Sequence, residues 1–257
     1  MKMLYIIVCE LGACIQFVWI ILVTAVRKPC PPSEIFSQIL RVTQQSLSTT
    51  ALAGFFVGAI LTVQFTLQMV QFGALGYLGG LTTSGTVREV GPLLIAFMLS
   101  GKIGAYTSAE LGTMKVTEQI DAIRCLGADP IREIVLPRFI GIIASSFFLL
   151  GLGLVMSISG GMIMASFFSG VNYEEYLRHI PTIVNPISIA NGLVKCFVFA
   201  VVLASICTYK GYTTSGGAKG VGRSAVNTAV ATMVGIVVAD WFTSTLFDIL
   251  INVWMER

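Results

Sequence analysis

The chain has 257 residues, of which 55% are hydrophobic and 11% charged, and its mean hydropathy is +0.86. Soluble domains carry about 25% charged residues, so this composition excludes a water-exposed globular surface over most of the chain. The net charge of +3 is too mild for the clustered basic face of a nucleic-acid-binding protein, and we expect no nucleic-acid partner.

The N-terminal region, residues 1–48, contains two different apolar patterns. Residues 4–26 are apolar and end at Arg27, Lys28 and a proline-rich break. This run exceeds the about 7–15 apolar residues of a signal peptide, so it is either a membrane span or an interfacial or re-entrant element. Residues 33–48 mix apolar residues with Gln and Ser, which predicts an amphipathic surface helix.

Five further segments are long and apolar enough to cross a hydrocarbon layer of about 30 Å, which requires about 20 residues. We predict an all-α integral membrane protein with about five transmembrane helices, forming a single domain over residues 1–257. The predicted spans are residues 49–72, 90–109, 139–168, 191–209 and 226–252.

Basic residues gather in alternate loops of this predicted topology. The segment 115–137 between the second and third spans and the segment 210–224 between the fourth and fifth are rich in Lys and Arg, whereas Arg178 is the only basic residue of the segment 170–190. By the positive-inside rule, the basic segments are predicted to be cytoplasmic and the C-terminus external.

Small residues recur at helical spacing in two of the predicted spans. They form the rows Gly54-x-x-x-Gly58 and Ala231-x-x-x-Gly235-x-x-x-Ala239. Such rows allow helices in lipid to approach closely, either within one subunit or between subunits.

The cytoplasmic segment 115–137 predicts a short amphipathic helix that starts after Thr117, as its N-cap, and stops at Gly127. This helix either lies on the lipid headgroups or fits a groove in a soluble partner. Farther along, residues 217–224 nearly match a phosphate-binding loop, but Arg223 replaces the lysine and no strand precedes the motif. We therefore expect no ATPase activity in this chain, and any ATP-driven role requires a separate subunit.

Charged residues inside the predicted spans are candidates for function, because each costs about 2.5–3.5 kcal/mol or more in a membrane. Four such charges stand out: Arg88 and Glu89 open the second span, Lys195 lies in the fourth and Asp240 in the fifth. One interpretation is a structural ion pair between Lys195 and Asp240, with Glu89 competing for the same ammonium group. The other is a wet cavity in which these charges engage lipid headgroups.

The six cysteines include no C-x-x-C pair and lie mostly in apolar runs, so we interpret them as packing residues. His179 is the only histidine and lies in a polar loop, which disfavours a His-rich metal site or a Ser-His-Asp triad. We expect neither a metal nor a cofactor.

From about residue 47 to its end, the chain resembles the MlaE family of ABC-transporter permeases, which serve MCE-type lipid-trafficking systems. The motifs that carry this resemblance are REVGP at 88–92, SAELGTM at 108–114, EQIDA at 118–122, DPIR at 129–132, PRF at 137–139, NGLVK at 191–195, GY at 211–212 and TSGGA at 214–218.

The resemblance implies a homodimer in the bacterial inner membrane, with one cytoplasmic ATPase per subunit and an extracytoplasmic MCE-domain lipid-binding protein as a further partner. It implies transport of phospholipid or a related lipid, in the context of outer-membrane lipid asymmetry. It also places polar residues at an outward-facing lipid cavity, at the positions of Arg88, Glu89, Lys195 and Asp240. The residues that it assigns to a coupling helix entering the ATPase are Glu118, Gln119, Ile120, Asp121 and Ala122.

Two other functions remain open from the sequence. The first is a membrane enzyme that modifies lipids, although the spans lack a clustered His or acid-rich metal constellation. The second is a passive scaffold, for which four charges near the membrane interior would be an unnecessary burden.

Overall fold

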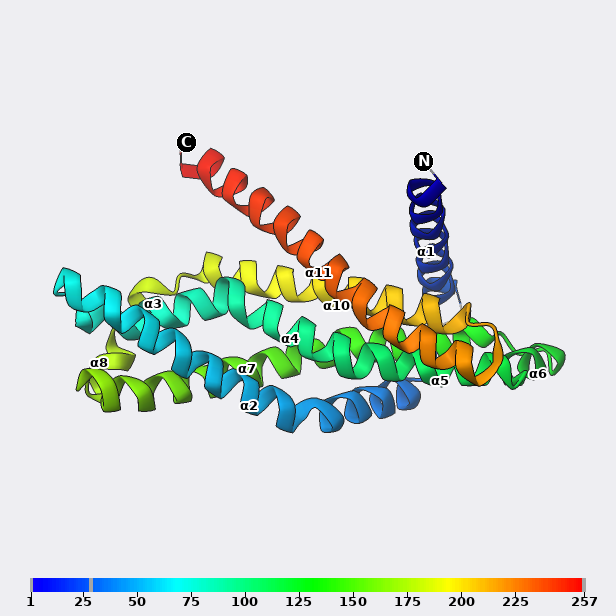
Figure 1. The fold of residues 1–257 in the computed structure, drawn as a ribbon, viewed down its shortest axis with the longest axis horizontal. Coiled ribbons are helices and arrows are strands. Elements are labelled where there is room, and N and C mark those ends of the chain that lie inside the picture. The colour runs from blue at the N-terminus through cyan, green and yellow to red at the C-terminus, as the bar shows by residue number, and fades with distance from the viewer. Residues whose placement is uncertain (1, 28–29, 256–257) are drawn as a thin grey trace. The chain divides into compact units, whose positions relative to one another are not determined.

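The computed structural model describes residues 2–27 and 30–255, which are almost entirely helical and include no strand (Figure 1). This confirms the predicted all-α class. Lys28 and Pro29, at the end of the first apolar stretch, lie outside the described residues. In chain order the elements are α1 (Lys2–Arg27), α2 (Pro32–Phe72), η1 (Leu75–Tyr77), α3 (Leu78–Gly85), η2 (Thr86–Val90), α4 (Gly91–Leu99), η3 (Ser100–Gly104), α5 (Ala105–Val116), α6 (Gln119–Cys125), η4 (Ile131–Val135), α7 (Leu136–Ser169), α8 (Tyr173–Arg178), α9 (Ile180–Ile183), α10 (Pro186–Tyr212) and α11 (Gly217–Met255).

Six helical runs of the described residues are long and apolar enough to cross a membrane. Four of them contain the first four predicted spans, a fifth covers residues 226–249 of the predicted span 226–252, and the sixth is the N-terminal stretch. The predicted surface helix at 33–48 and the first predicted span form one continuous helix, α2. The runs are Val8–Arg27, Pro32–Phe72, Leu75–Val116, Ile131–Ser169, Pro186–Tyr212 and Gly217–Ile249.

Two π-helical segments, η2 and η4, each end two residues before a proline. The amide of Gly91 donates to the Thr86 carbonyl, and the amide of Leu136 donates to the Ile131 carbonyl, each five residues back. Pro92 and Pro137 come next and have no N–H to continue the α-helical pattern. The wider turn therefore forms where the α-helical hydrogen-bond pattern is already interrupted, and such π-bulges are frequent at functional sites.

The chain forms two compact units, each built from three segments that are distant in sequence. Unit 1 comprises Met1–Val42, Leu99–Ser145 and Ala200–Val237, and unit 2 comprises Thr43–Met98, Ser146–Phe199 and Val238–Arg257. By sequence, unit 1 carries twelve of the 16 Lys and Arg residues of the chain. Most of the basic charge thus belongs to one unit.

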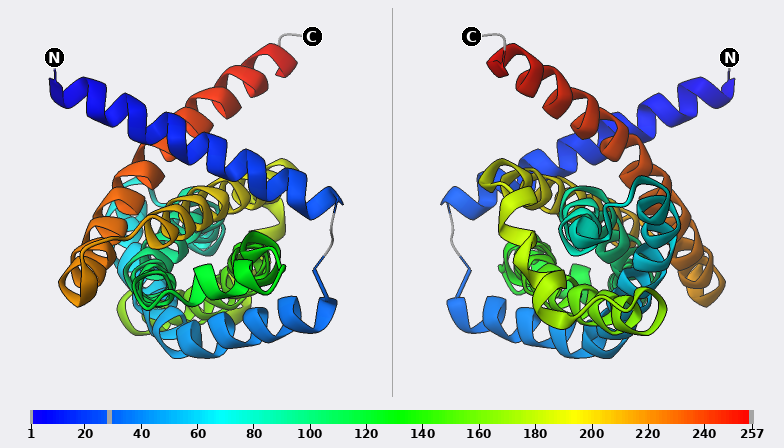
Figure 2. Two further views of the ribbon diagram at one scale, coloured as in Figure 1. Left: turned by 90° about the vertical axis from the view of Figure 1, so that its right-hand side faces the viewer. Right: turned by 90° about the vertical axis from the view of Figure 1, so that its left-hand side faces the viewer.

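In unit 1, α1 runs across the neighbouring helices and not alongside them (Figures 1 and 2). It contacts η4, and the ring of Phe17 lies 5.9 Å from that of Tyr209 and 5.3 Å from that of Tyr212. Phe17 and Ile21 are buried, whereas the opposite side of α1 exposes a row of apolar side chains. That row is Val8, Leu11, Ile15, Trp19, Leu22 and Val26.

In unit 2, the first predicted small-residue row packs within the chain. A Cβ added at Gly54 would lie 2.6 Å from the Gly153 carbonyl oxygen, and one at Gly58 would overlap the carbonyl of Ser157. Only glycine allows α2 and α7 to approach so closely. The short helices α8 and α9 pack against α3. The buried side chain of Tyr176 on α8 forms a 2.8 Å hydrogen bond with the hydroxyl of Thr82 on α3.

Candidate functional site

The side chain of Lys195, on α10 in unit 2, is fully buried and has three polar partners. Its ammonium forms an ion pair with Glu89, lies 3.0 Å from Asp240 Oδ1, and donates a 2.7 Å hydrogen bond to Ser244 Oγ. A lysine ammonium has three N–H donors, so each donor has one acceptor. We name Glu89, Lys195, Asp240 and Ser244 the lysine cluster.

The lysine cluster depends on a close approach between α10 and η2. A Cβ added at Gly192 would overlap the carbonyl oxygen of Val87, which places the two backbones in direct contact. Gly192 lies three residues before Lys195, and Val87 lies two residues before Glu89. The glycine therefore brings the lysine within reach of the carboxylate.

The structure unites three of the four predicted intramembrane charges. Lys195 contacts Glu89 and Asp240 at the same time, so the two pairings that the sequence left as alternatives coexist. Arg88 is half-buried and forms no ion pair with the described residues. Ser244 was not predicted, although it lies four residues after Asp240 and hence on the same helix face.

The lysine cluster combines a buried ammonium group with two partly exposed carboxylates. Lys195 is 0% exposed, whereas the side chains of Asp240 and Glu89 are 24% and 46% exposed. Burying a charge is tolerable only when it is paired and hydrogen-bonded, and the ammonium meets that condition. Both carboxylate side chains are therefore partly accessible to water or to a polar group of a ligand.

The second candidate region is the predicted coupling segment in unit 1, where a short helix, α6, forms as expected. Gln119 and Ala122 are exposed at its surface, as is Glu118 immediately before it. Ile120 is fully buried with Leu111 and Ile134. Ile120 therefore fixes the helix in unit 1 and cannot itself contact a partner.

The predicted side-chain N-cap at Thr117 is wrong. The Thr117 hydroxyl donates to the Thr113 carbonyl at 2.8 Å, at the end of the preceding helix α5. The cap position is occupied by Glu118, which has a left-handed backbone with φ of 60° and makes no side-chain cap bond. Glu118 adopts this conformation in the two-residue turn between α5 and α6, although it is unfavourable for residues other than glycine.

Asp121 is held on α6 by two cations. Lys115 Nζ lies 2.9 Å from one carboxylate oxygen, and Arg124 lies 3.5 Å from the other. The hydrogen bond from Lys115 is the main reason that the pKa of Asp121 is lowered from its ordinary value. Asp121 is therefore ionised at neutral pH, and its charge is largely matched within the chain.

The segment that resembles a phosphate-binding loop, residues 217–224, is the first two turns of α11. A helix cannot wrap around a triphosphate as the loop of that motif does, and the preceding element is helix α10 and not a strand.

A family model described as permease MlaE matches residues 35–246. The chain belongs to the MlaE permease family. Among MlaE relatives, a probable ABC transporter permease protein of Rickettsia conorii is 34% identical over 222 residues, covering 86% of each chain. One from Synechocystis sp. is 34% identical over 209 residues, covering 81% of this chain and 80% of its own.

A plant member of the MlaE family also matches. The chloroplastic protein TRIGALACTOSYLDIACYLGLYCEROL 1 of Arabidopsis thaliana is 32% identical over 210 residues, which cover 82% of this chain and 60% of the plant protein. With six apolar helical runs among its described residues, this MlaE family member is a multi-pass membrane protein and a transporter permease.

Proposed function

We propose that this chain is the permease subunit of an ABC transporter that moves phospholipid or a related lipid between the bacterial inner membrane and an extracytoplasmic MCE-type carrier protein. The observation that carries the proposal is the lysine cluster, a set of charges inside apolar helices with carboxylates open to a ligand. The name of the plant relative is that of a galactolipid, which agrees with a lipid cargo.

In this proposal a separate cytoplasmic ATPase binds at α6. The exposed residues Glu118, Gln119 and Ala122 form the contact surface, together with Leu126, which is 85% exposed at the end of the helix. A hollow of about 520 Å³ borders α6 and is lined by residues that include Gln119, Thr113 and Tyr106. An exposed leucine beside polar side chains is suited to a protein partner.

The distribution of charge supports a cytoplasmic position for the loops of unit 1. Twelve of the 16 basic residues belong to that unit, and the positive-inside rule assigns such loops to the cytoplasm. We further propose that residues 1–48 include an interfacial element, because α1 runs across the other helices of unit 1 (Figure 2). A helix with this direction lies along the membrane plane when its neighbours cross the membrane.

A second copy of the chain completes the proposed transporter. Helix α11 exposes a long apolar row that includes Val226, Val230, Val234 and Trp241.

The proposed transport function is tested by co-expressing the wild-type permease with candidate ATPases and measuring lipid transfer from proteoliposomes to an acceptor. We expect an ATPase to co-purify and ATP to drive the transfer. Normal purification with no ATPase, and no ATP-dependent lipid transfer with any candidate ATPase, would contradict the proposal.

A further inference from the structure

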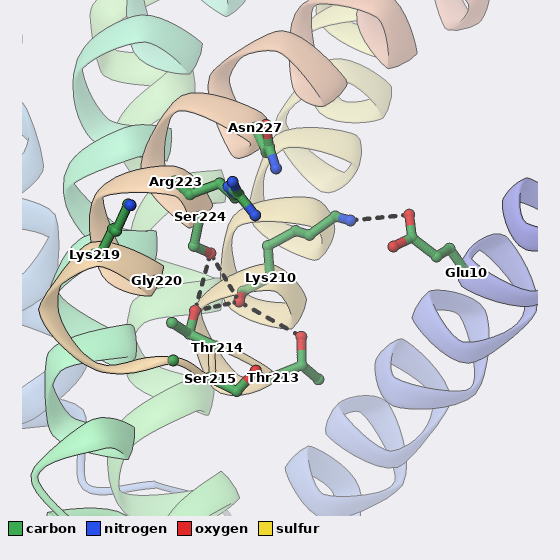
Figure 3. Close-up of a pocket in the computed structure, with 11 residues that line it drawn as sticks. Glu10, Lys210, Thr213, Thr214, Ser215, Lys219, Gly220, Arg223, Ser224 and Asn227 are labelled. Atoms are coloured by element: carbon green, nitrogen blue, oxygen red, sulfur yellow. Dashed lines mark hydrogen bonds and ion pairs between the residues drawn. The ribbon is translucent and has the colours of Figure 1, made fainter.

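A polar pocket of about 560 Å³ opens in unit 1 beside the turn between α10 and α11 (Figure 3). Its cations come from two helices. Lys210 lies near the end of α10, and Lys219 and Arg223 lie four residues apart on one face of α11. Asn227 continues that face. Other lining residues are Glu10, Thr213, Ser215 and Gly216.

Buried hydroxyl groups hold the wall of this pocket in place. Thr214 Oγ1 donates a 2.8 Å hydrogen bond to the Lys210 carbonyl and lies 2.9 Å from Ser224 Oγ. Below them, Thr228 donates to Ser108 at 2.9 Å, and both of these residues are fully buried. The turn is thus fixed by bonds to α5, α10 and α11, and the pocket is part of the folded structure.

The pocket holds more positive than negative charge. Lys210 is paired with Glu10 of α1 at 2.9 Å, and Figure 3 shows its side chain extended toward that carboxylate. Lys219 and Arg223 have no carboxylate partner among the described residues. The pocket therefore has a net charge that favours an anion, and an arginine fork beside hydroxyl groups suits the oxygens of a phosphate.

The pocket also lies where a polar surface changes to an apolar one. On α11, the exposed side chains of Val226 and Val230 follow Arg223 within two turns, and on α1 the exposed Leu11 follows Glu10. Exposed apolar side chains next to cations are typical of the headgroup region of a membrane.

We propose that this pocket binds the phosphate group of an anionic lipid, at a site separate from the lysine cluster. In this site Arg223 and Lys219 contact the phosphate oxygens. Glu10 limits the affinity, because it neutralises Lys210. Free inorganic phosphate offers the same chemistry, and the apolar surface beside the pocket favours the lipid.

Native mass spectrometry of the purified full chain tests this site. The protein is incubated with equal amounts of phosphatidylglycerol, which is anionic, and phosphatidylethanolamine, which is zwitterionic, and the retained lipids are counted. We expect wild type to prefer phosphatidylglycerol and Arg223→Gln to lower its retention about fivefold, while Arg223→Lys, which keeps the charge and loses the fork, should give a retention between the two. Arg178→Gln, which removes one exposed cation from α8, is the matched control and should leave retention unchanged.

Glu10→Gln provides a test of opposite sign, because freeing Lys210 should raise the retention of phosphatidylglycerol. Equal retention of phosphatidylglycerol by wild type and Arg223→Gln would overturn the proposal, provided that thermal melting curves show both proteins to be folded. Retention of added inorganic phosphate without any preference for phosphatidylglycerol would overturn the assignment to lipid. These measurements need neither ATP nor transport, so their outcome is independent of the proposed function.

Discussion

Gly192 on α10 is in backbone contact with the carbonyl of Val87 on η2, and no larger residue fits at this position. This contact holds the ammonium of Lys195 against the carboxylate of Glu89. The lysine cluster thus depends on a residue that carries no charge.

Gly192→Ala should push α10 away from η2. We expect a loss of about 1–3 kcal/mol in stability, as for other overpacked sites, together with weaker lipid transport. Gly151→Ala on α7 is the matched control, since a Cβ there meets nothing within 4 Å. That variant should be stabilised by about 0.5–1 kcal/mol. The melting temperatures of the two variants are compared, and equal values for Gly192→Ala and Gly151→Ala would contradict the account.

Glu118 combines a strained backbone with an exposed carboxylate, and two substitutions separate these properties. Glu118→Gly removes the charge and relieves the left-handed conformation, so the chain should be about 1 kcal/mol more stable. Glu118→Ala removes the charge and keeps the strain. Both variants should weaken stimulation of ATP hydrolysis in the complex. Full stimulation in Glu118→Gly would show that the carboxylate has no part in coupling.

The carboxylate of Asp121 should not titrate between pH 5 and 8. Its pKa is lowered in the folded chain, chiefly by the hydrogen bond from Lys115, so its contribution to stability is present above the ordinary carboxyl pKa of about 3.9. That contribution is lost only as the pH falls through the lower, folded pKa. The difference in melting temperature between wild type and Asp121→Asn should stay constant from pH 8 to 5. A difference that shrinks toward pH 5 would contradict this assignment.

The proposed topology predicts which side of the membrane each loop faces. Cys125 is exposed at the end of α6 and can be kept as the only native cysteine, while Lys219→Cys at the start of α11 and Glu174→Cys on α8 report on two other connections between spans. A membrane-impermeant thiol reagent should label positions 125 and 219 only from the cytoplasmic side and position 174 only from outside. External labelling at position 219 would invert the topology.

Helix class and span positions followed from the sequence, because runs of about 20 apolar residues have few alternative structures in a membrane. The contacts between helices did not. Lys195 and Asp240 lie 45 residues apart, and the sequence left Asp240 and Glu89 as competing partners of Lys195, whereas the fold gives the ammonium both carboxylates at once. Ser244 was missed because a single hydroxyl in an apolar helix is a weak signal. The left-handed Glu118 was missed because residue type there does not indicate a positive φ.

Lipid transport by a neutral lysine cluster tests the central claim most directly. The variant Glu89→Gln, Lys195→Met and Asp240→Asn removes all three charges together and leaves no buried charge unpaired, so it should fold. Its melting temperature and the amount of co-purified ATPase serve as controls. If the charges engage lipid headgroups, the variant should bind the ATPase normally and lose ATP-dependent lipid transfer. Transfer at the wild-type rate, at normal expression, would show that the cluster is only structural and would contradict the account.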